Sequence, residues 1–185
     1  MKHFFLTLLF FTPITFYSQT IDGFCNLKFG AKQKDVLALN WVKDSIVQQK
    51  QGENDLDVFV KHVEFNDKTY DLCIFRFYRG ELYGGLMAKL FESKEILLQE
   101  VDSLKDAIKI ESLDFRNHED SEIDRFSFQD STQNELLVEA INEKNLYVLR
   151  LHYASSDLSE KKKKEDDKRR IENSIEIEVK DIKSN

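Results

Sequence analysis

The apolar run Phe4–Phe16 constrains this chain more than any other feature. It follows the short basic start Met1–His3 and gives way to the polar residues Ser18–Thr20, the three-part pattern of a secretory signal peptide. The run is shorter than the roughly 20 apolar residues that a transmembrane helix needs, and it contains Pro13. We therefore predict that residues 1–19 are a cleaved signal peptide and that the protein is exported to the periplasm or the extracellular space. About 165 residues then remain, which is enough for one domain.

The charge of the chain argues against two classes of partner. The formal net charge is −7 at pH 7, whereas nucleic acids and anionic lipid surfaces attract basic patches. The one strong basic cluster, Lys161–Lys164, is bordered by Glu160 and by Glu165–Asp167. No second apolar stretch approaches membrane length, so we expect no transmembrane segment and no nucleic-acid partner. Another envelope protein is the expected partner.

Cys25 and Cys73 are the only two cysteines. In an oxidising compartment such a pair can form a structural disulfide. The alternative is two buried thiols that behave as small apolar residues. The residues ahead of Cys25 include Asp22 and place Phe24 directly before it, which argues against lipidation of this cysteine.

Hydrophobic periodicity predicts a helix and three strands in the first half of the chain. The helix spans Ala31–Val42 and is followed by the polar stretch Asp44–Asp55, which reads as a loop. Three segments rich in β-branched and aromatic residues read as strands, with a tight turn at Arg79–Gly80 and a bulge or close backbone contact at Gly84–Gly85. These strands are Asp57–Phe65, Thr69–Tyr78 and Leu82–Phe91.

The second half repeats this order. Apolar residues at helical spacing predict a helix over Leu97–Ile108, with Ser93 as its N-cap. The acidic stretch Ser112–Asp124 reads as a loop. Three further strands are predicted at Arg125–Gln129, Glu135–Ile141 and Leu146–Tyr153.

The C-terminal residues form a charged stretch followed by a segment in which apolar and charged residues alternate. Ser159–Asn173 is almost entirely charged and predicts a solvated helix supported by acid–base pairs, with disorder as the alternative. Ile175–Lys180 alternates apolar and charged residues, which is typical of an edge strand.

This order favours an α+β fold in which helices pack on one face of an antiparallel sheet, in a tandem α-β-β-β arrangement. We expect a signal peptide at 1–19, an α+β domain at 20–158, and a charged helix with an edge strand at 159–185.

Two short motifs resemble small bacterial envelope proteins of the BamE/SmpA and β-lactamase-inhibitor-protein-like group. The first is Leu27–Val36 (LKFGAKQKDV), similar to the glycine, polar stretch and helical valine that open those proteins. The second is Phe77–Leu82 (FYRGEL), which resembles their central hairpin. The chain departs from the group in having Ala31 where a capping Ser or Thr is usual, and it lacks the lipid-anchor cysteine of the BamE-like members. The resemblance implies a two-layer α+β protein that binds other proteins, and it assigns no functional residue.

Motifs that carry catalysis or bind cofactors are missing from the sequence. His62, His118 and His152 form no zinc-binding pattern, and there is no G-x-S-x-G elbow or glycine-rich phosphate loop. The acidic run Asn117–Asp124 lacks the central glycine of an EF-hand-like calcium loop. We therefore expect no metal and no cofactor. A hydrolase would need His118 or His152 to meet a carboxylate in a cleft.

Aromatic residues crowd the three central strands, and most of them are expected to pack in the core. Tyr78 and Tyr83 are the candidates for a surface that faces away from the helix, where aromatic side chains favour protein binding. The leading prediction is a non-enzymatic protein-binding or scaffold module. The first alternative binds a small or lipophilic ligand between sheet and helices, and the second is a hydrolase of unrecognised type.

Overall fold

The computed structural model describes residues 21–109, 114–120, 123–143 and 146–184. It confirms the α+β prediction: one two-stranded and one eight-stranded antiparallel sheet are combined with helices. The elements in chain order are β1 (Gly23–Phe24), β2 (Leu27–Lys28), α1 (Gln33–Leu37), α2 (Asn40–Lys43), β3 (Ile46–Gln51), β4 (Asp55–Phe65), β5 (Lys68–Tyr78), β6 (Glu81–Phe91), α3 (Lys94–Lys109), β7 (Asp114–Asp120), β8 (Ile123–Gln129), β9 (Glu135–Glu143), β10 (Leu146–Ala154) and α4 (Ser156–Ser184).

The large sheet consists of two consecutive halves. In each half, helical residues come first and an antiparallel meander of four strands follows: α1 and α2 before β3–β6, and α3 before β7–β10. The last strands of the two meanders, β6 and β10, pair with each other, giving the order β3-β4-β5-β6-β10-β9-β8-β7. The tandem arrangement is therefore present with four strands per half rather than three.

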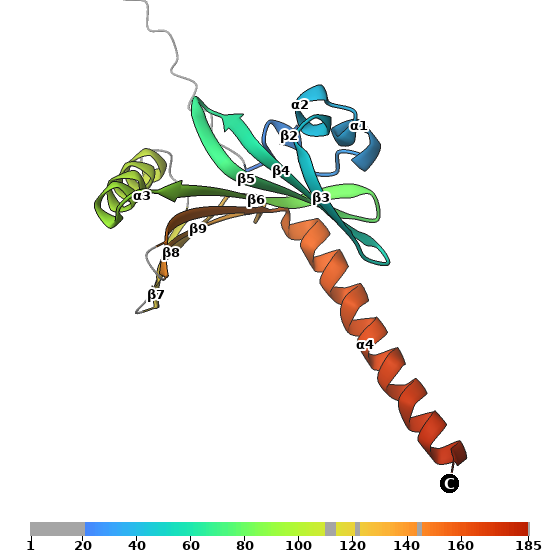
Figure 1. Ribbon diagram of the computed structural model, residues 1–185. Helices are drawn as coiled ribbons and strands as arrows, with labels where there is room; N and C mark the ends of the chain where they lie inside the picture. The colour runs from blue at the N-terminus through green and yellow to red at the C-terminus, as the bar shows by residue number, and fades with distance from the viewer. Residues whose placement is uncertain (1–20, 110–113, 121–122, 144–145, 185) are drawn as a thin grey trace, which may run out of the picture.

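One face of this sheet, here called the covered face, carries the hydrophobic core. Along β5 the fully buried Cys73 and Phe75 point to this face, and the opposing residues on the other strands are buried with them. Helix α3 packs here through Leu97 and Val101, and Val36 and Val42 of α1 and α2 join the same core. Figure 1 shows α1, α2 and α3 on this side of the sheet.

The N-terminal hairpin β1–β2 completes the covered face. Phe24 is 1% exposed, and its ring lies against Phe75 and Tyr153 with centroid distances of 5.2 and 5.5 Å. The ring occupies the space above Gly85, where a Cβ atom would lie 2.2 Å from Phe24 Cε1. The predicted close contact at Gly84–Gly85 is thus explained, and a register shift beside Tyr83 supplies the bulge.

The described fold begins with an anchored residue. The backbone N–H of Ile21 donates to the buried carboxylate of Asp130 at 2.7 Å, and the Asn134 amide donates to the Ile21 carbonyl at 2.8 Å. These bonds tie the start of the described chain to the turn between β8 and β9.

Two predicted loops contain strands. β3 lies within the polar stretch Asp44–Asp55, and β7 lies within the acidic stretch Ser112–Asp124. Both strands are edges of the sheet. The strand prediction relies on alternation of apolar and polar residues. A strand at the edge of a sheet can form without this alternation.

Two further predictions, one of a helix and one of a strand, also need correction. The helix expected at Ala31–Val42 is broken at Leu39, which is extended (φ −66°, ψ 127°). In an unbroken helix, the side chains of Val36 and Val42 would point about 120° apart around the helix axis. The break at Leu39 lets both side chains reach the core. Ile175–Lys180 is not an edge strand but part of α4. Once a charged helix has formed, adding residues to it costs less than starting a new element.

Helix α4 follows β10 and leaves on the other side of the sheet from α1–α3 (Figure 1). Among the described residues, no helix is long and apolar enough to cross a membrane.

Candidate functional site

The face opposite the core, here called the open face, is built from the residues that alternate with those of the core. Strand register arranges its residues in three rows that run across the strands. The first row is Asp57, Arg76, Gly84, Ala154, Glu135 and Gln129; the second is Phe59, Ile74, Leu86, His152, Leu137 and Ser127; the third is Lys61, Leu72, Ala88, Arg150, Glu139 and Arg125.

The second row is the apolar strip of the open face. Ile74 and Leu86 are 9% and 8% exposed, yet they lie outside the main core cluster. Phe59 and Leu137 are half-buried. Leu90 continues this face beyond the third row and is 54% exposed. The open face therefore combines covered apolar side chains with accessible ones.

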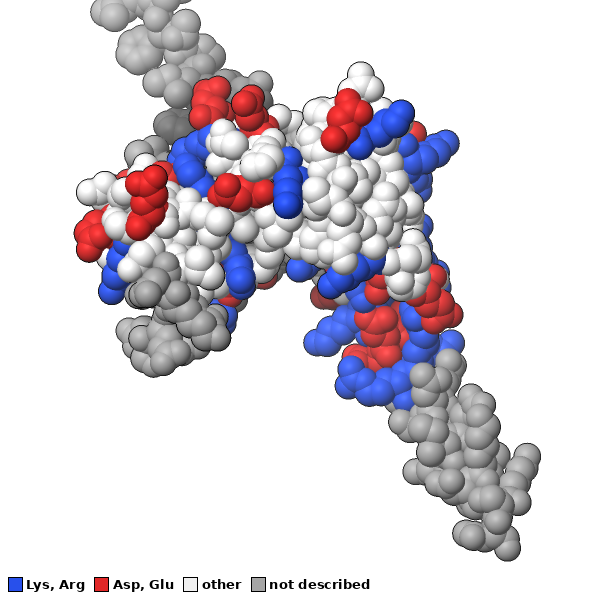
Figure 2. All heavy atoms as spheres, viewed as in Figure 1, with Lys and Arg blue, Asp and Glu red and all other residues white. Residues whose placement is uncertain are grey.

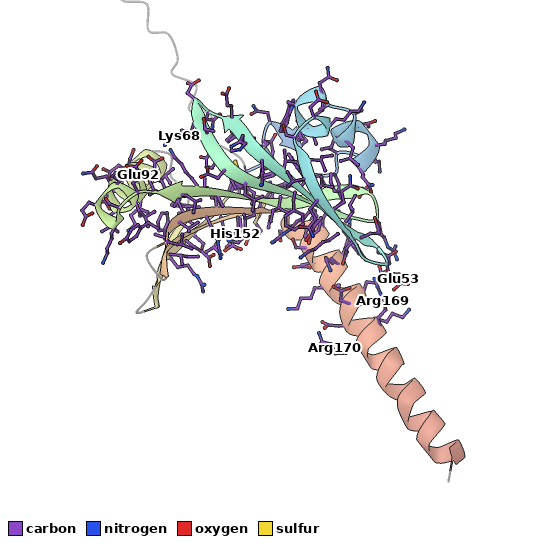
Figure 3. The ribbon with its side chains drawn as sticks, in the orientation of Figure 1. Glu53, Lys68, Glu92, His152, Arg169 and Arg170 are labelled. Carbon is purple, nitrogen blue, oxygen red and sulfur yellow. The ribbon has the colours of Figure 1, made fainter. Side chains whose placement is uncertain are left out.

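A buried carboxylate organises the β8–β10 part of this face. Glu139 is 8% exposed; it forms an ion pair with Arg125 at 2.8 Å and a hydrogen bond with His152 Nε2 at 2.9 Å. Burial lowers the pKa of His152, and the cations Arg76 and Arg150 lower it further, although Glu139 acts in the opposite direction. Figure 3 places His152 on the side of the sheet away from α1–α3.

Three other cations of the open face have no such partner. Lys61 and Arg150 are exposed and Arg76 is half-buried. None of the three forms an ion pair within the described part of the chain. Asp57 lies opposite Arg76 on β4 without pairing with it. The open face thus carries two exposed cations, Lys61 and Arg150, that form no ion pair within the described residues, on a chain whose net charge is −7.

Helix α4 occupies the corner of this side near the β5–β6 turn. Glu165 accepts a hydrogen bond from the Tyr78 hydroxyl and pairs with Arg79 at 2.6 Å. These contacts lower the pKa of Glu165, the Tyr78 bond most. Lys162 pairs with Asp55 at 3.0 Å.

Charged residues continue this contact along the helix. Figure 3 shows Arg169 beside Glu53 of the β3–β4 turn, and the two pair at 2.8 Å. Acidic and basic residues are interleaved along this part of α4 (Figure 2).

The predicted site residues Tyr78 and Tyr83 both lie on this side. Tyr78 is 4% exposed because α4 covers it, and Tyr83 is half-buried, which raises the pKa of its hydroxyl. Tyr78 therefore holds the chain's own helix. A role for either residue in binding a partner stays a prediction.

The two cysteines meet on the covered face as free thiols. Their Sγ atoms are 3.8 Å apart, and Cys25 Sγ is also 3.8 Å from Met87 Sδ. Burial raises the pKa of Cys73, and its contact with Cys25 raises it further. No disulfide is present, but no other cysteine competes for either sulfur.

A cleft of about 610 Å³ adjoins Cys25, between α2, the β1–β2 turn and the end of β4. Its walls include three residues with positive φ: Cys25 (51°), Asn26 (61°) and His62 (53°). Trp41, 42% exposed, also lines it. Cys25 and Asn26 are the two residues of the β1–β2 turn, in which positive φ at both positions is usual.

The remaining candidates for chemistry are not assembled into a site. Among the described residues, no three His, Cys, Asp or Glu side chains lie close enough together to hold a metal ion. His152 does meet a carboxylate, but Arg125 shares that carboxylate. His118 lies in β7, and its side chain is outside the described residues, as is the acidic run around it.

Comparison with protein-family models, curated proteins and solved structures finds no match for this chain.

Proposed function

We propose that this protein is an exported, non-enzymatic module that binds another envelope protein through the open face of its sheet. The observation that carries the proposal is the contrast between the two faces. Helices and the N-terminal hairpin cover one face, while the other presents exposed Leu90 and cations without ion-pair partners. The resemblance of Leu27–Val36 and Phe77–Leu82 to envelope proteins that bind proteins supports the same function.

In-cell chemical crosslinking tests this binding. A C-terminally tagged protein would be crosslinked, purified and compared with the double variant Leu90→Asp/Val148→Asp, which places charge on the open face. The matched control is Ile96→Asp/Leu98→Asp, two exposed positions on α3. We expect one dominant partner that the control retains and the open-face variant loses. Equal recovery from both variants would contradict the proposal.

Export is the second part of the proposal. Its support is the predicted leader at 1–19, and Ile21, just beyond it, is held to the fold by hydrogen bonds with Asp130 and Asn134. Fractionation and N-terminal sequencing test it. The expected result is a processed protein that begins near Thr20 in the periplasm or medium, and an unprocessed protein in the cytoplasm would contradict it.

In an oxidising compartment we expect Cys25 and Cys73 to form the predicted disulfide. A bond requires the sulfurs to approach from 3.8 Å to about 2.05 Å, a movement within reach of side-chain rotation. Alkylation of unreduced, denatured protein from the exported fraction measures it. Bridged protein takes up no reagent until it is reduced, whereas labelling of both thiols would show that the bridge does not form.

The alternative function is binding of a small lipophilic ligand, which the cleft beside Trp41 favours. Its volume lies within the range of roughly 300–1,000 Å³ that is usual for ligand pockets. Trp41 is the only tryptophan, so its fluorescence reports on this cleft alone. Titration with an apolar naphthalene dye should quench it if the cleft binds such molecules, and an unchanged spectrum would count against this alternative.

A further inference from the structure

We propose that the open face binds an acidic amphipathic α-helix of the partner protein, laid across the strands along the second row. This inference rests on the proposed function and adds the chemistry of the partner. It follows from the order of the three rows: an apolar strip lies between a first row that holds Arg76 together with Asp57 and Glu135 and a third row that holds the exposed cations Lys61 and Arg150.

The spacing of the rows matches the width of a helix. Arg76 in the first row and Leu72 in the third are four residues apart on β5, which is about 13 Å along a strand. An α-helix with its side chains is roughly 10–12 Å across. A helix lying on Ile74 and Leu86 would therefore have Arg76 along one flank and Lys61 and Arg150 along the other.

The charges of the rows determine which charged side chains the two flanks of the bound helix must carry. Glu139 is paired with Arg125, so it does not cancel the charge of Lys61 or Arg150 in the same row. A helix with glutamates on both sides of a leucine stripe would place a carboxylate near each of these cations and near Arg76. A basic helix would instead meet the like charges of Lys61 and Arg150, which form no ion pair within the described residues.

The surface also has room for a helix. The first and third rows contain Gly84, Ala154 and Ala88 where β6 and β10 cross the middle of the sheet. Small residues there let a helix backbone approach the second row, in which half-buried Phe59 and Leu137 offer the accessible apolar contacts and Ile74 and Leu86 lie beneath. Figure 1 shows α4 descending at one end of this face and β7–β9 curling down at the other, so the two bound it.

Fluorescence anisotropy with designed peptides tests the proposal on the full-length mature protein. The probe is a labelled peptide of about 20 residues, long enough to hold helical structure, with a leucine stripe flanked by glutamates. The comparison peptide has lysine at every glutamate position. The protein variants are Arg76→Ser/Arg150→Ser and, as a matched control with the same change in charge, Lys34→Ser/Lys43→Ser on α1 and α2.

We expect the acidic peptide to bind in a salt-sensitive way. The Arg76→Ser/Arg150→Ser variant should bind it at least about tenfold more weakly, a loss of about 1.4 kcal/mol, while the control stays within about twofold of the native protein. The single variant Arg150→Ser, at an exposed position, keeps the test valid if the double variant does not fold.

Three results would overturn the inference: no binding of the acidic peptide, equal binding of the basic peptide, or equal affinity for the two double variants. The in-cell experiment separates these outcomes from failure of the proposed function. If crosslinking depends on Leu90 and Val148 but the acidic peptide does not bind, only the partner chemistry is wrong. If crosslinking does not depend on them, the open face is not the binding surface.

Discussion

The two faces of the large sheet are made from the same strands, yet they differ in what they contact. On β5, Phe75 is fully buried in the core, while its neighbours Ile74 and Arg76 belong to the open face. The covered face has three helices and a hairpin packed against it. The open face has α4 at one corner and, over the rest, an apolar strip, the Arg125–Glu139 pair and the cations Lys61 and Arg150. The difference shows that the helices and the hairpin of the described fold pack against one face only, and the proposed binding function concerns the other.

Truncating a phenylalanine on each face should give the largest contrast. Phe75→Ala removes a fully buried ring that contacts Phe24 and Trp41, and we expect it to lower the free energy of unfolding by about 3–5 kcal/mol. Phe59→Ala, on the neighbouring strand but on the open face, should cost less than half as much because that ring is only half-buried. Urea denaturation measures both. Equal losses of unfolding free energy in the two variants would contradict the distinction between the faces.

Gly85→Ala should have the next largest effect. The added Cβ would lie 2.2 Å from the Phe24 ring, so the ring must move, at a cost of about 1–3 kcal/mol. The matched control is Gly52→Ala, whose Cβ would be 3.4 Å from Asp55 Cβ and should change stability by less than about 0.5 kcal/mol. Comparable melting temperatures for the two variants would show that Phe24 is not fixed above Gly85.

The corner where α4 meets the open face should respond to acid. The pKa of Glu165 is lowered chiefly by the Tyr78 hydrogen bond. Its contribution to stability is therefore complete above the unfolded pKa of about 4.3 and is lost as the pH falls through the lower folded value. Hydrogen exchange in the first turns of α4 should accelerate below pH 4 in the native protein.

The variant Glu165→Gln isolates that response. It should show faster exchange at neutral pH and little further change in acid. Tyr78→Phe should raise the pKa of Glu165 toward its ordinary value, and NMR of the carboxyl groups measures this shift. An unchanged pKa would mean that the hydroxyl does not hold the helix.

The smallest expected effect is a change in the pKa of His152, which reports on the charges of the open face. His152 faces Glu139 on β9, Arg76 on β5 and Arg150 on its own strand, and its pKa is lowered by burial and by those arginines. The unfolded chain therefore takes up the proton more readily, so this group lowers stability as the pH falls below about 6.5. Arg76→Ala should raise the pKa of His152, and an NMR titration measures the change. Lys43→Ala, on the far side, should leave the pKa unchanged.

The sequence predicted the parts of this fold that bury side chains. Strands β4, β5, β6, β8, β9 and β10 and helix α3 were all indicated by apolar periodicity, because each packs against the core. The edge strand β3 is almost entirely exposed, and its polar sequence predicts a loop. The C-terminal alternation at Ile175–Lys180 fits a strand in sequence but has become the end of a continuous helix.

The candidate site was harder to predict than the fold. Lys61, Arg76 and Arg150 belong to three strands of two different meanders, and only the pairing of β6 with β10 brings them onto one surface. No local motif marks such a set. The approach of Cys25 to Cys73 could be suggested from their number but not measured. Tyr78 was a candidate for the surface facing away from the helix, but its cover by α4 depends on a contact with Glu165, 87 residues away.

Photo-crosslinking at one position on each side of the sheet tests the central claim most directly. A benzoyl-phenylalanine would replace either Leu90 on the open face, 54% exposed, or Ile96 on α3, 46% exposed, in cells that make the protein. We predict a single defined adduct from position 90 and none from position 96. An adduct from position 96 alone, or no adduct from position 90, would contradict the assignment of the open face as the binding surface.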